Sequence, residues 1–202
     1  MLVNQQKTHI VVSKLPRNED YLTNYDGYVV TTEHFDLANP VTKVDDIPDY
    51  EMYSQTIDSL NKRFGNRVLK GIEIGYIASE KDRIIDYLAD KDYDLKLLSV
   101  HHNGQFDYLD DEVKDMDPAI VIPQYFAQLS EALVVIEADV FAHFDYSFRV
   151  FGLSVAEFKQ YEAQFLPILD QVIKNKLAFE LNAKSAYLYD NLALYEYVID
   201  LY

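Results

Sequence analysis

The sequence predicts an α/β fold in which buried strands alternate with amphipathic helices and form a distorted, incomplete barrel. Two observations predict the alternation: short β-branched apolar runs recur along the chain, and the segments between them have helical periodicity. A third observation favours a barrel over an open sheet, because ligand-type side chains follow several of the runs. No Gly-, Ser- or Pro-rich stretch divides the 202 residues, so we expect one domain spanning residues 1–202.

Five short apolar runs are predicted to be buried strands, because polar or turn residues bound each of them. In chain order the runs are Tyr28–Thr32, Leu69–Ile74, Leu95–Val100, Asp139–Ala142 and Leu177–Leu181. The chain contains neither G-x-G-x-x-G nor G-x-x-x-x-G-K-[ST], which disfavours a dinucleotide site or a phosphate-binding P-loop.

Five further segments have the periodicity of amphipathic helices. They are Tyr50–Phe64, Lys81–Leu88, Ile122–Ile136, Ser154–Ile173 and Ala186–Tyr202. The fourth opens with a capping box, in which Ser154 and Glu157 satisfy free backbone amides at the helix start.

The composition restricts the partners of the protein. Eighteen basic residues stand against 34 acidic ones, a net charge of −16, which is a poor electrostatic footprint for nucleic acid or anionic lipid. The apolar runs are shorter than the ~20 residues of a membrane span, and the N-terminus has no apolar signal region. Cysteine is absent, which excludes disulfides and thiolate chemistry. We expect a cytoplasmic protein without nucleic-acid or membrane partners.

Ligand-type side chains gather at the ends of the predicted strands. Four of the five histidines, His34, His101, His102 and His143, lie directly after such strands, and Glu73 lies near the end of another. In a βα barrel these ends converge on one face, where the active site is built. Imidazole and carboxylate groups gathered there are the ligands of a zinc, manganese or iron site. We therefore favour a metal site over separate structural histidines.

The candidate residues differ in the roles expected of them. An unpaired Glu73 would be costly to bury, so either a bridge between two metal ions or a salt bridge with Lys or Arg is expected. His102 points to the opposite side from His101 if the strand continues, which predicts an outer contact or a surface position. Glu33 is expected to be a partner of His34 or a solvent-facing group.

Three later residues are weaker candidates. Glu180 and Asn182 could line the pocket, or they could cap a following helix. Arg149 lies six residues after His143 and could clamp a substrate phosphate through its bidentate fork. The alternative for Arg149 is an ordinary surface position.

The ordered motifs TTEHFD, GIEIGY, LSVHHNG, AHFDYSFR and FELN resemble the polymerase-and-histidinol-phosphatase (PHP) family, and within it the histidinol-phosphatase branch. The resemblance runs from about residue 21 to the C-terminus. It implies a distorted seven-stranded βα barrel, or (βα)7-type barrel, that binds two or three divalent ions of zinc, manganese or iron. It also implies hydrolysis of a small phosphorylated substrate, L-histidinol phosphate.

By motif, this resemblance assigns His34, Glu73, His101 and His143 as metal ligands. It implies catalytic roles for Glu73, as a bridge between two ions, and for His101, and it places Arg149 near a phosphate-contacting arginine. The implied reaction is direct attack of metal-activated water on the phosphate, without a covalent phospho-enzyme.

Two motifs of the family depart from this sequence. The opening His-x-His has only His9 as a counterpart, with Lys7 two residues before it, which leaves His9 as one further candidate ligand. The closing Gly-Ser-Asp-x-His has no counterpart before Tyr202, so the resemblance implies a truncated domain.

These departures keep two alternatives open. One is an inactive or truncated family remnant that binds metal partially and associates through an open barrel edge. The other is a PHP-type nuclease, which the acidity of the chain disfavours. The oligomeric state stays open.

Overall fold

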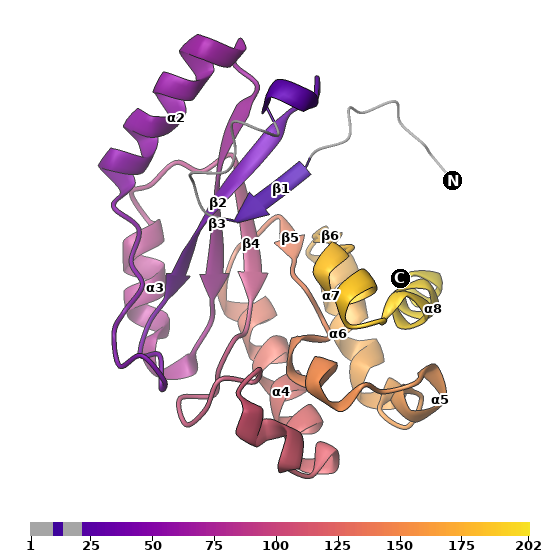
Figure 1. The fold of residues 1–202 in the computed structure, drawn as a ribbon. Coiled ribbons are helices and arrows are strands. Elements are labelled where there is room, and N and C mark those ends of the chain that lie inside the picture. The colour runs from indigo at the N-terminus through magenta and orange to yellow at the C-terminus, as the bar shows by residue number, and fades with distance from the viewer. Residues whose placement is uncertain (1–9, 14–21) are drawn as a thin grey trace.

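A computed structural model of the protein describes residues 10–13 and 22–202 (Figure 1). Its centre is one sheet of six parallel strands in the order β1-β2-β3-β4-β5-β6. The strands are β1 Ile10–Ser13, β2 Val29–Asp36, β3 Val68–Gly75, β4 Leu95–Ser99, β5 Val140–Phe141 and β6 Ala178–Phe179. Within the described residues β1 and β6 do not pair with each other, so the sheet is an incomplete barrel. The predicted α/β class and parallel barrel-like arrangement are confirmed.

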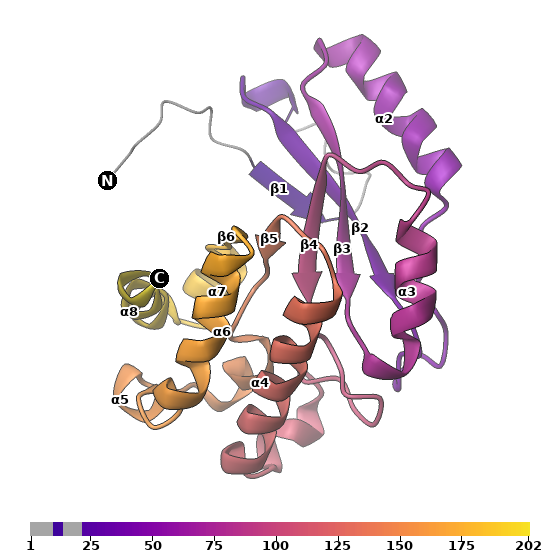
Figure 2. The ribbon, with the colours of Figure 1, turned by 180° about the vertical axis from the view of Figure 1, so that it is seen from behind.

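The helices follow the strands in the expected order. They are α2 Tyr50–Phe64, α3 Lys81–Leu88, α4 Pro118–Val135, α5 Val155–Phe158, α6 Glu162–Lys174, α7 Ala183–Leu188 and α8 Leu192–Leu201. Seen from behind, α4 and α6 lie side by side, and α3 lies on the side of β2 and β3 (Figure 2). Short 3-10 helices complete the connections, η2 at Asp111–Asp115 and η3 at Tyr146–Phe151.

Alternation along β2 separates the core from the site. Val29 packs against buried residues of α2, and Phe35 packs on Tyr87 of α3. His34 and Asp36, on either side of Phe35 in the sequence, point to the other face and line a cavity. This is the two-residue period of a strand, in which successive side chains point to opposite faces.

An aromatic core lies directly behind the site. Phe144 is fully buried, and five aromatic rings surround it at centroid distances of 5.0–6.0 Å. These rings come from η3, α5, α6, β6 and α8: Phe148, Phe158, Phe165, Phe179 and Tyr195. The core therefore supports the loop that carries His143.

Two predicted helices are each divided in the structure. The segment Ser154–Ile173 is a one-turn α5, which carries the predicted capping box, and a separate α6. The segment predicted as Ala186–Tyr202 begins at Ala183 and breaks between α7 and α8, where Asp190 has a φ of +57°. A residue in the left-handed conformation cannot continue an α-helix, so the backbone turns at Asp190. The apolar periodicity of the sequence nevertheless runs through both helices.

Strand ends also differ from the predicted ones. β2 continues to Asp36, so His34 lies inside the strand rather than after it. The fourth strand is shortened to Val140–Phe141, and His143 just beyond it has a φ of +40°.

By length and composition, α4 is one described helix that could cross a membrane. Its residues Ile122, Tyr125 and Leu129 lie in the main apolar core, where it packs on α6, so it also fits a core helix.

Candidate metal centre

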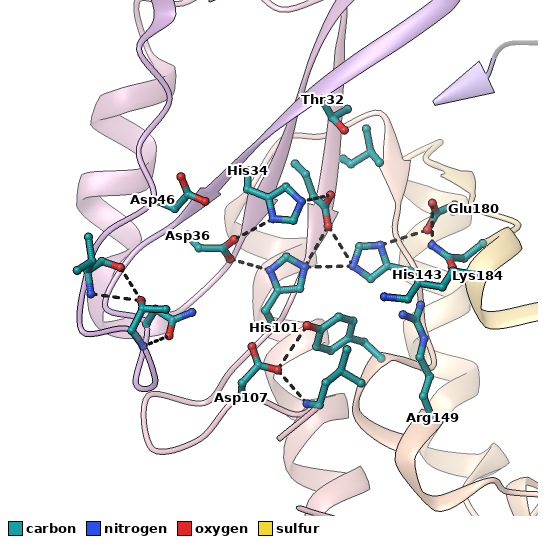
Figure 3. Close-up of a pocket in the computed structure, with 18 residues that line it drawn as sticks. Thr32, His34, Asp36, Asp46, His101, Asp107, His143, Arg149, Glu180 and Lys184 are labelled. Carbon is teal, nitrogen blue, oxygen red and sulfur yellow. Dashed lines mark hydrogen bonds and ion pairs between the residues drawn. The ribbon is translucent and has the colours of Figure 1, made fainter. Parts of the chain in front are cut away.

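The carboxyl ends of four neighbouring strands bring the predicted ligands together (Figure 3). His34 of β2 lies directly across from Glu73 of β3 in the strand register. His101 follows β4, and His143 follows β5. Parallel pairing aligns these ends, which explains how residues far apart in sequence share one cavity.

Glu73 is the centre of the group. Its Oε1 lies 3.0 Å from Nε2 of His101 and 3.3 Å from Nε2 of His143. Its Oε2 lies 3.5 Å from Nε2 of His34. The salt bridge with Lys or Arg considered for Glu73 is not found among the described residues, where its ionic partners are these three imidazoles.

The opposite nitrogen of each ring meets a carboxylate. Nδ1 of His101 lies 2.7 Å from Oδ1 of Asp36, and Nδ1 of His34 lies 3.5 Å from Oδ2 of the same residue. Nδ1 of His143 lies 3.2 Å from Oε2 of Glu180. Carboxylates placed behind metal-ligating histidines orient the rings in this way.

The donor set fits a divalent ion in chemistry and in size. The Nε2 atoms of His101 and His143 are 3.3 Å apart, close to their distances from Glu73 Oε1. Ligands about 2.0–2.1 Å from a tetrahedral zinc ion are about 3.3 Å from one another. These three residues are buried, and their ligand atoms lie within 4.8 Å of one another. Glu73, His101 and His143 could therefore hold an ion, with His34 beside them.

The ionisable side chains of this cluster shift one another's pKa values. Burial opposes ionisation of Glu73, but the hydrogen bond from His101 and the charge of His143 lower its pKa to about 2. Burial also opposes charge on His101, yet Asp36 and Glu73 raise its pKa well above the ordinary value. The pKa of Asp36 is held well below its usual range, against burial, by the attraction of His101. In the metal-free group, protons on imidazole therefore balance the carboxylates.

A glycine makes room for this network. A Cβ added at Gly75, the last residue of β3, would lie 1.8 Å from Oδ1 of Asp36 and 3.2 Å from Nδ1 of His101. A side chain there would displace the carboxylate that orients the ring.

Asp36 is a residue of the site that the sequence analysis missed. The predicted strand ends at Thr32, so Asp36 was not expected to lie in a strand. In the structure β2 continues to Asp36, which lies two residues after His34 and on the same face. The spacing His-x-Asp within TTEHFD was the available signal, since residues at i and i+2 of a strand point the same way.

Other candidates have more limited roles. His102 is 2% exposed and is not among the residues that line the cavity, so its expected surface position is wrong. Its Nδ1 accepts from the backbone N–H of Gly104, and burial lowers its pKa. Asn182 lines the cavity and also caps α7, accepting from Ser185 N. His9 lies outside the described residues.

The cluster opens into a cavity of about 430 Å³. Arg149 lines it and is only 6% exposed, so it is not a surface arginine. Its Nε donates to Asp145 at 3.2 Å, while its Nη2 has no hydrogen-bond partner in the described part of the chain. Lys184 of α7, which sequence reasoning missed, reaches toward the same part of the cavity beside His143 (Figure 3).

Known proteins resemble the chain in sequence and fold. The sequence pattern of the PHP domain matches residues 18–184. A probable histidinol-phosphatase from Clostridium acetobutylicum is 26% identical over 160 residues, which are 77% of this chain and 61% of that protein. The chain thus spans about three fifths of the length of this curated relative.

A solved structure has the same fold. Histidinol phosphate phosphatase from Lactococcus lactis, complexed with zinc, L-histidinol and phosphate, superposes with a TM-score of 0.80 at 20% identity. The superposition covers 98% of this chain and 80% of the other.

Proposed function

Because the chain belongs to the PHP domain family, we propose that it is a metal-dependent phosphate monoester hydrolase acting on L-histidinol phosphate. The observation that carries the proposal is the convergence of His34, His101 and His143 on Glu73. Each imidazole turns one nitrogen inward and the other toward a carboxylate. This arrangement prepares nitrogen donors for a cation.

Glu73, His101 and His143 would hold the metal, and a bound divalent cation there supplies Lewis acidity toward water and phosphoryl oxygens. The two oxygens of Glu73 face different imidazoles, which suits the expected bridging carboxylate. Asp36 holds the ring of His101 in place through Nδ1 of that ring, and Glu180 holds the ring of His143 in the same way. We expect no covalent intermediate with the chain.

The charge of the cavity supports a phosphate substrate that binds together with cations. Five carboxylates line it, at Asp36, Asp46, Glu73, Asp107 and Glu180, against two permanent cations, Arg149 and Lys184. When the imidazoles are neutral metal ligands, this surplus would repel a phosphate dianion unless bound cations supplied positive charge. Arg149 lines the cavity, and its positive charge would attract a phosphoryl group of the substrate.

The choice of alcohol rests on the relatives. The Clostridium protein is named as a probable histidinol-phosphatase, and the Lactococcus structure contains L-histidinol and phosphate. Both support the same small substrate for this chain. The net charge of −16 argues against a nuclease function.

The proposal is tested with the purified chain and its Glu73→Gln variant. The wild-type protein should bind two or more divalent ions and release phosphate from L-histidinol phosphate with manganese or zinc. Glu73→Gln should abolish this release, because the central anionic ligand is lost. Glu51→Gln, an exposed position on α2, is the matched control and should keep the activity. Less than one ion per chain together with no hydrolysis under any cation would refute the proposal.

A further inference from the structure

Asp107 is a cavity carboxyl that the histidine cluster does not use. It lies in the loop between β4 and η2, is partly buried, and lines the cavity. Figure 3 shows it below His101, on a different side of the cavity from Arg149 and Lys184. In the described part of the chain its hydrogen-bond partners are Leu109, Asp110 and Tyr146, none of which is a proposed metal ligand.

Hydrogen bonds hold this carboxyl in one orientation. Its Oδ1 accepts from the backbone N–H of Leu109 at 2.9 Å and from the hydroxyl of Tyr146 at 3.4 Å. The backbone N–H of Asp107 donates to Asp110 at 3.0 Å, which fixes the loop. Its Oδ2 has no hydrogen-bond partner among the residues that the structure describes, and in Figure 3 it is turned toward His101. One oxygen is therefore anchored, and the other faces the cavity.

Without a bound metal, the surroundings make this carboxyl a weaker acid than a solvent-exposed aspartate. Burial raises the pKa of Asp107 above its ordinary value, and the charge of Asp110 adds to the rise, while the hydrogen bond from Leu109 and the charges of His101 and His102 oppose it. The cluster carboxylates behave in the opposite way, because imidazoles hold the pKa values of Asp36 and Glu73 low. Asp46 also lines the cavity, but it is exposed to solvent.

We propose that Asp107 is the general acid of this site and protonates the ester oxygen of the leaving alcohol through Oδ2. The inference rests on the proposed phosphatase function and adds a catalytic residue to it. An alkoxide is a poor leaving group in water, so a positioned proton donor accelerates its departure by about 10²–10⁴-fold. Arg149 cannot serve, because a guanidinium does not release its proton in a protein.

The step conserves atoms and charge. The oxygen of water forms a bond to phosphorus while the phosphorus–ester oxygen bond breaks, and its electron pair stays on the ester oxygen. That oxygen takes the proton of Asp107 and leaves as the alcohol. The attacking water gives one proton to solvent, and Asp107 takes one back from solvent, so the products are the alcohol and hydrogen phosphate.

The test measures how the rate depends on the leaving group. Wild-type and Asp107→Asn proteins, loaded with manganese, are compared on phenyl, 4-chlorophenyl and 4-nitrophenyl phosphate and on L-histidinol phosphate. Asparagine keeps an oxygen that accepts from Leu109 and Tyr146, but its amide cannot donate the required proton. We expect kcat/KM for the alkyl ester to fall about 10²–10³-fold and that for 4-nitrophenyl phosphate to fall less than about 10-fold.

Two further variants separate catalysis from structure. Asp107→Glu keeps a proton donor and should retain a shallow dependence on leaving-group basicity. Asp46→Asn removes another cavity carboxylate and should leave that dependence as in the wild type.

The outcomes distinguish the general-acid role of Asp107 from the phosphatase function itself. An equal loss on all four esters, a loss confined to KM, or no loss in Asp107→Asn would overturn the general-acid role while leaving the phosphatase function standing. A steep dependence that appears in Asp46→Asn instead would also overturn it. A wild-type chain that hydrolyses none of the esters would refute the proposed function itself, and the inference with it.

Discussion

At the scale of single residues, the candidate centre depends on close approaches that leave no room for a larger side chain. Gly75 lets Asp36 approach His101, since a Cβ would overlap the Asp36 carboxylate. Asp36 in turn holds Nδ1 of His101, so that Nε2 of the ring faces Glu73. A chain of three contacts thus determines where one ligand nitrogen lies.

Gly75→Ala is therefore expected to weaken metal binding by about 10–100-fold, the usual effect of losing a group that orients a ligand. Zinc binding measured by isothermal titration calorimetry, with circular dichroism for the fold, tests this. Gly65→Ala is the control: nothing lies within 4 Å of its added Cβ, although its φ of +72° costs stability. Unchanged zinc affinity in Gly75→Ala would show that the carboxylate is not needed behind the ring.

Asp36→Asn tests the same supporting role of Asp36 without a steric change. The amide keeps the size of the side chain but removes the charge that faces His101 and His34. Metal content per chain after dialysis should fall, and Asp45→Asn, whose carboxylate pairs with Arg83 outside the cluster, should retain it. Equal metal content in both variants would contradict a supporting role for Asp36.

At the scale of elements, the helix ends carry clear local signals. The backbone N–H of Ala119 donates to Asp117 at the start of α4, and Pro118 occupies the first turn. The helix that follows packs in the main core, so its start bears on the whole domain.

Asp117→Ala should lower the free energy of unfolding by about 1 kcal/mol, because one free backbone amide loses its acceptor. Urea denaturation measures the change. Asp117→Asn keeps a capping oxygen and should lose much less. If both variants lose the same amount, the capping bond does not stabilise α4.

Element boundaries also mark the limit of sequence reasoning. α2 spans Tyr50–Phe64 as predicted, since Asp49 caps its start and Gly65 ends it in a left-handed conformation. The division between α7 and α8 was not predicted, although Asp190 and Asn191 are residue types that favour turns and the left-handed conformation. Similarly, His34 was predicted to follow a strand that ends at Thr32. In the structure, pairing with β3 extends this strand to Asp36.

At the scale of the whole molecule, the proposed centre joins separate parts of the chain. His34, Glu73, His101 and His143 belong to four successive βα units. Asp145, which is fully buried, accepts from Arg149, Asn191 and Tyr195 and so connects the cavity to α8. A metal ion bound here would contact the native arrangement and not the unfolded chain.

Zinc or manganese should therefore raise the melting temperature. At a free concentration 100 times the dissociation constant, binding adds about 2.7 kcal/mol, or roughly 5–11 °C for a chain of this size. Differential scanning calorimetry of protein stripped with EDTA and then reloaded measures the shift. His143→Ala should show a much smaller rise on reloading; a full rise would place the bound ion elsewhere.

The sequence by itself determined the α/β class, the alternation of helices with the five strands β2 to β6, and the residue types of the candidate centre. Local periodicity and the ligand chemistry of His34, Glu73, His101 and His143 are visible in the chain, because they depend on near neighbours. Only the tertiary structure decided that Asp36 and Lys184 share the cavity with them, that Glu180 contacts His143, and that Arg149 is buried. Those placements depend on strand register and on turns between distant segments, so a local pattern such as His-x-Asp indicates them only in part.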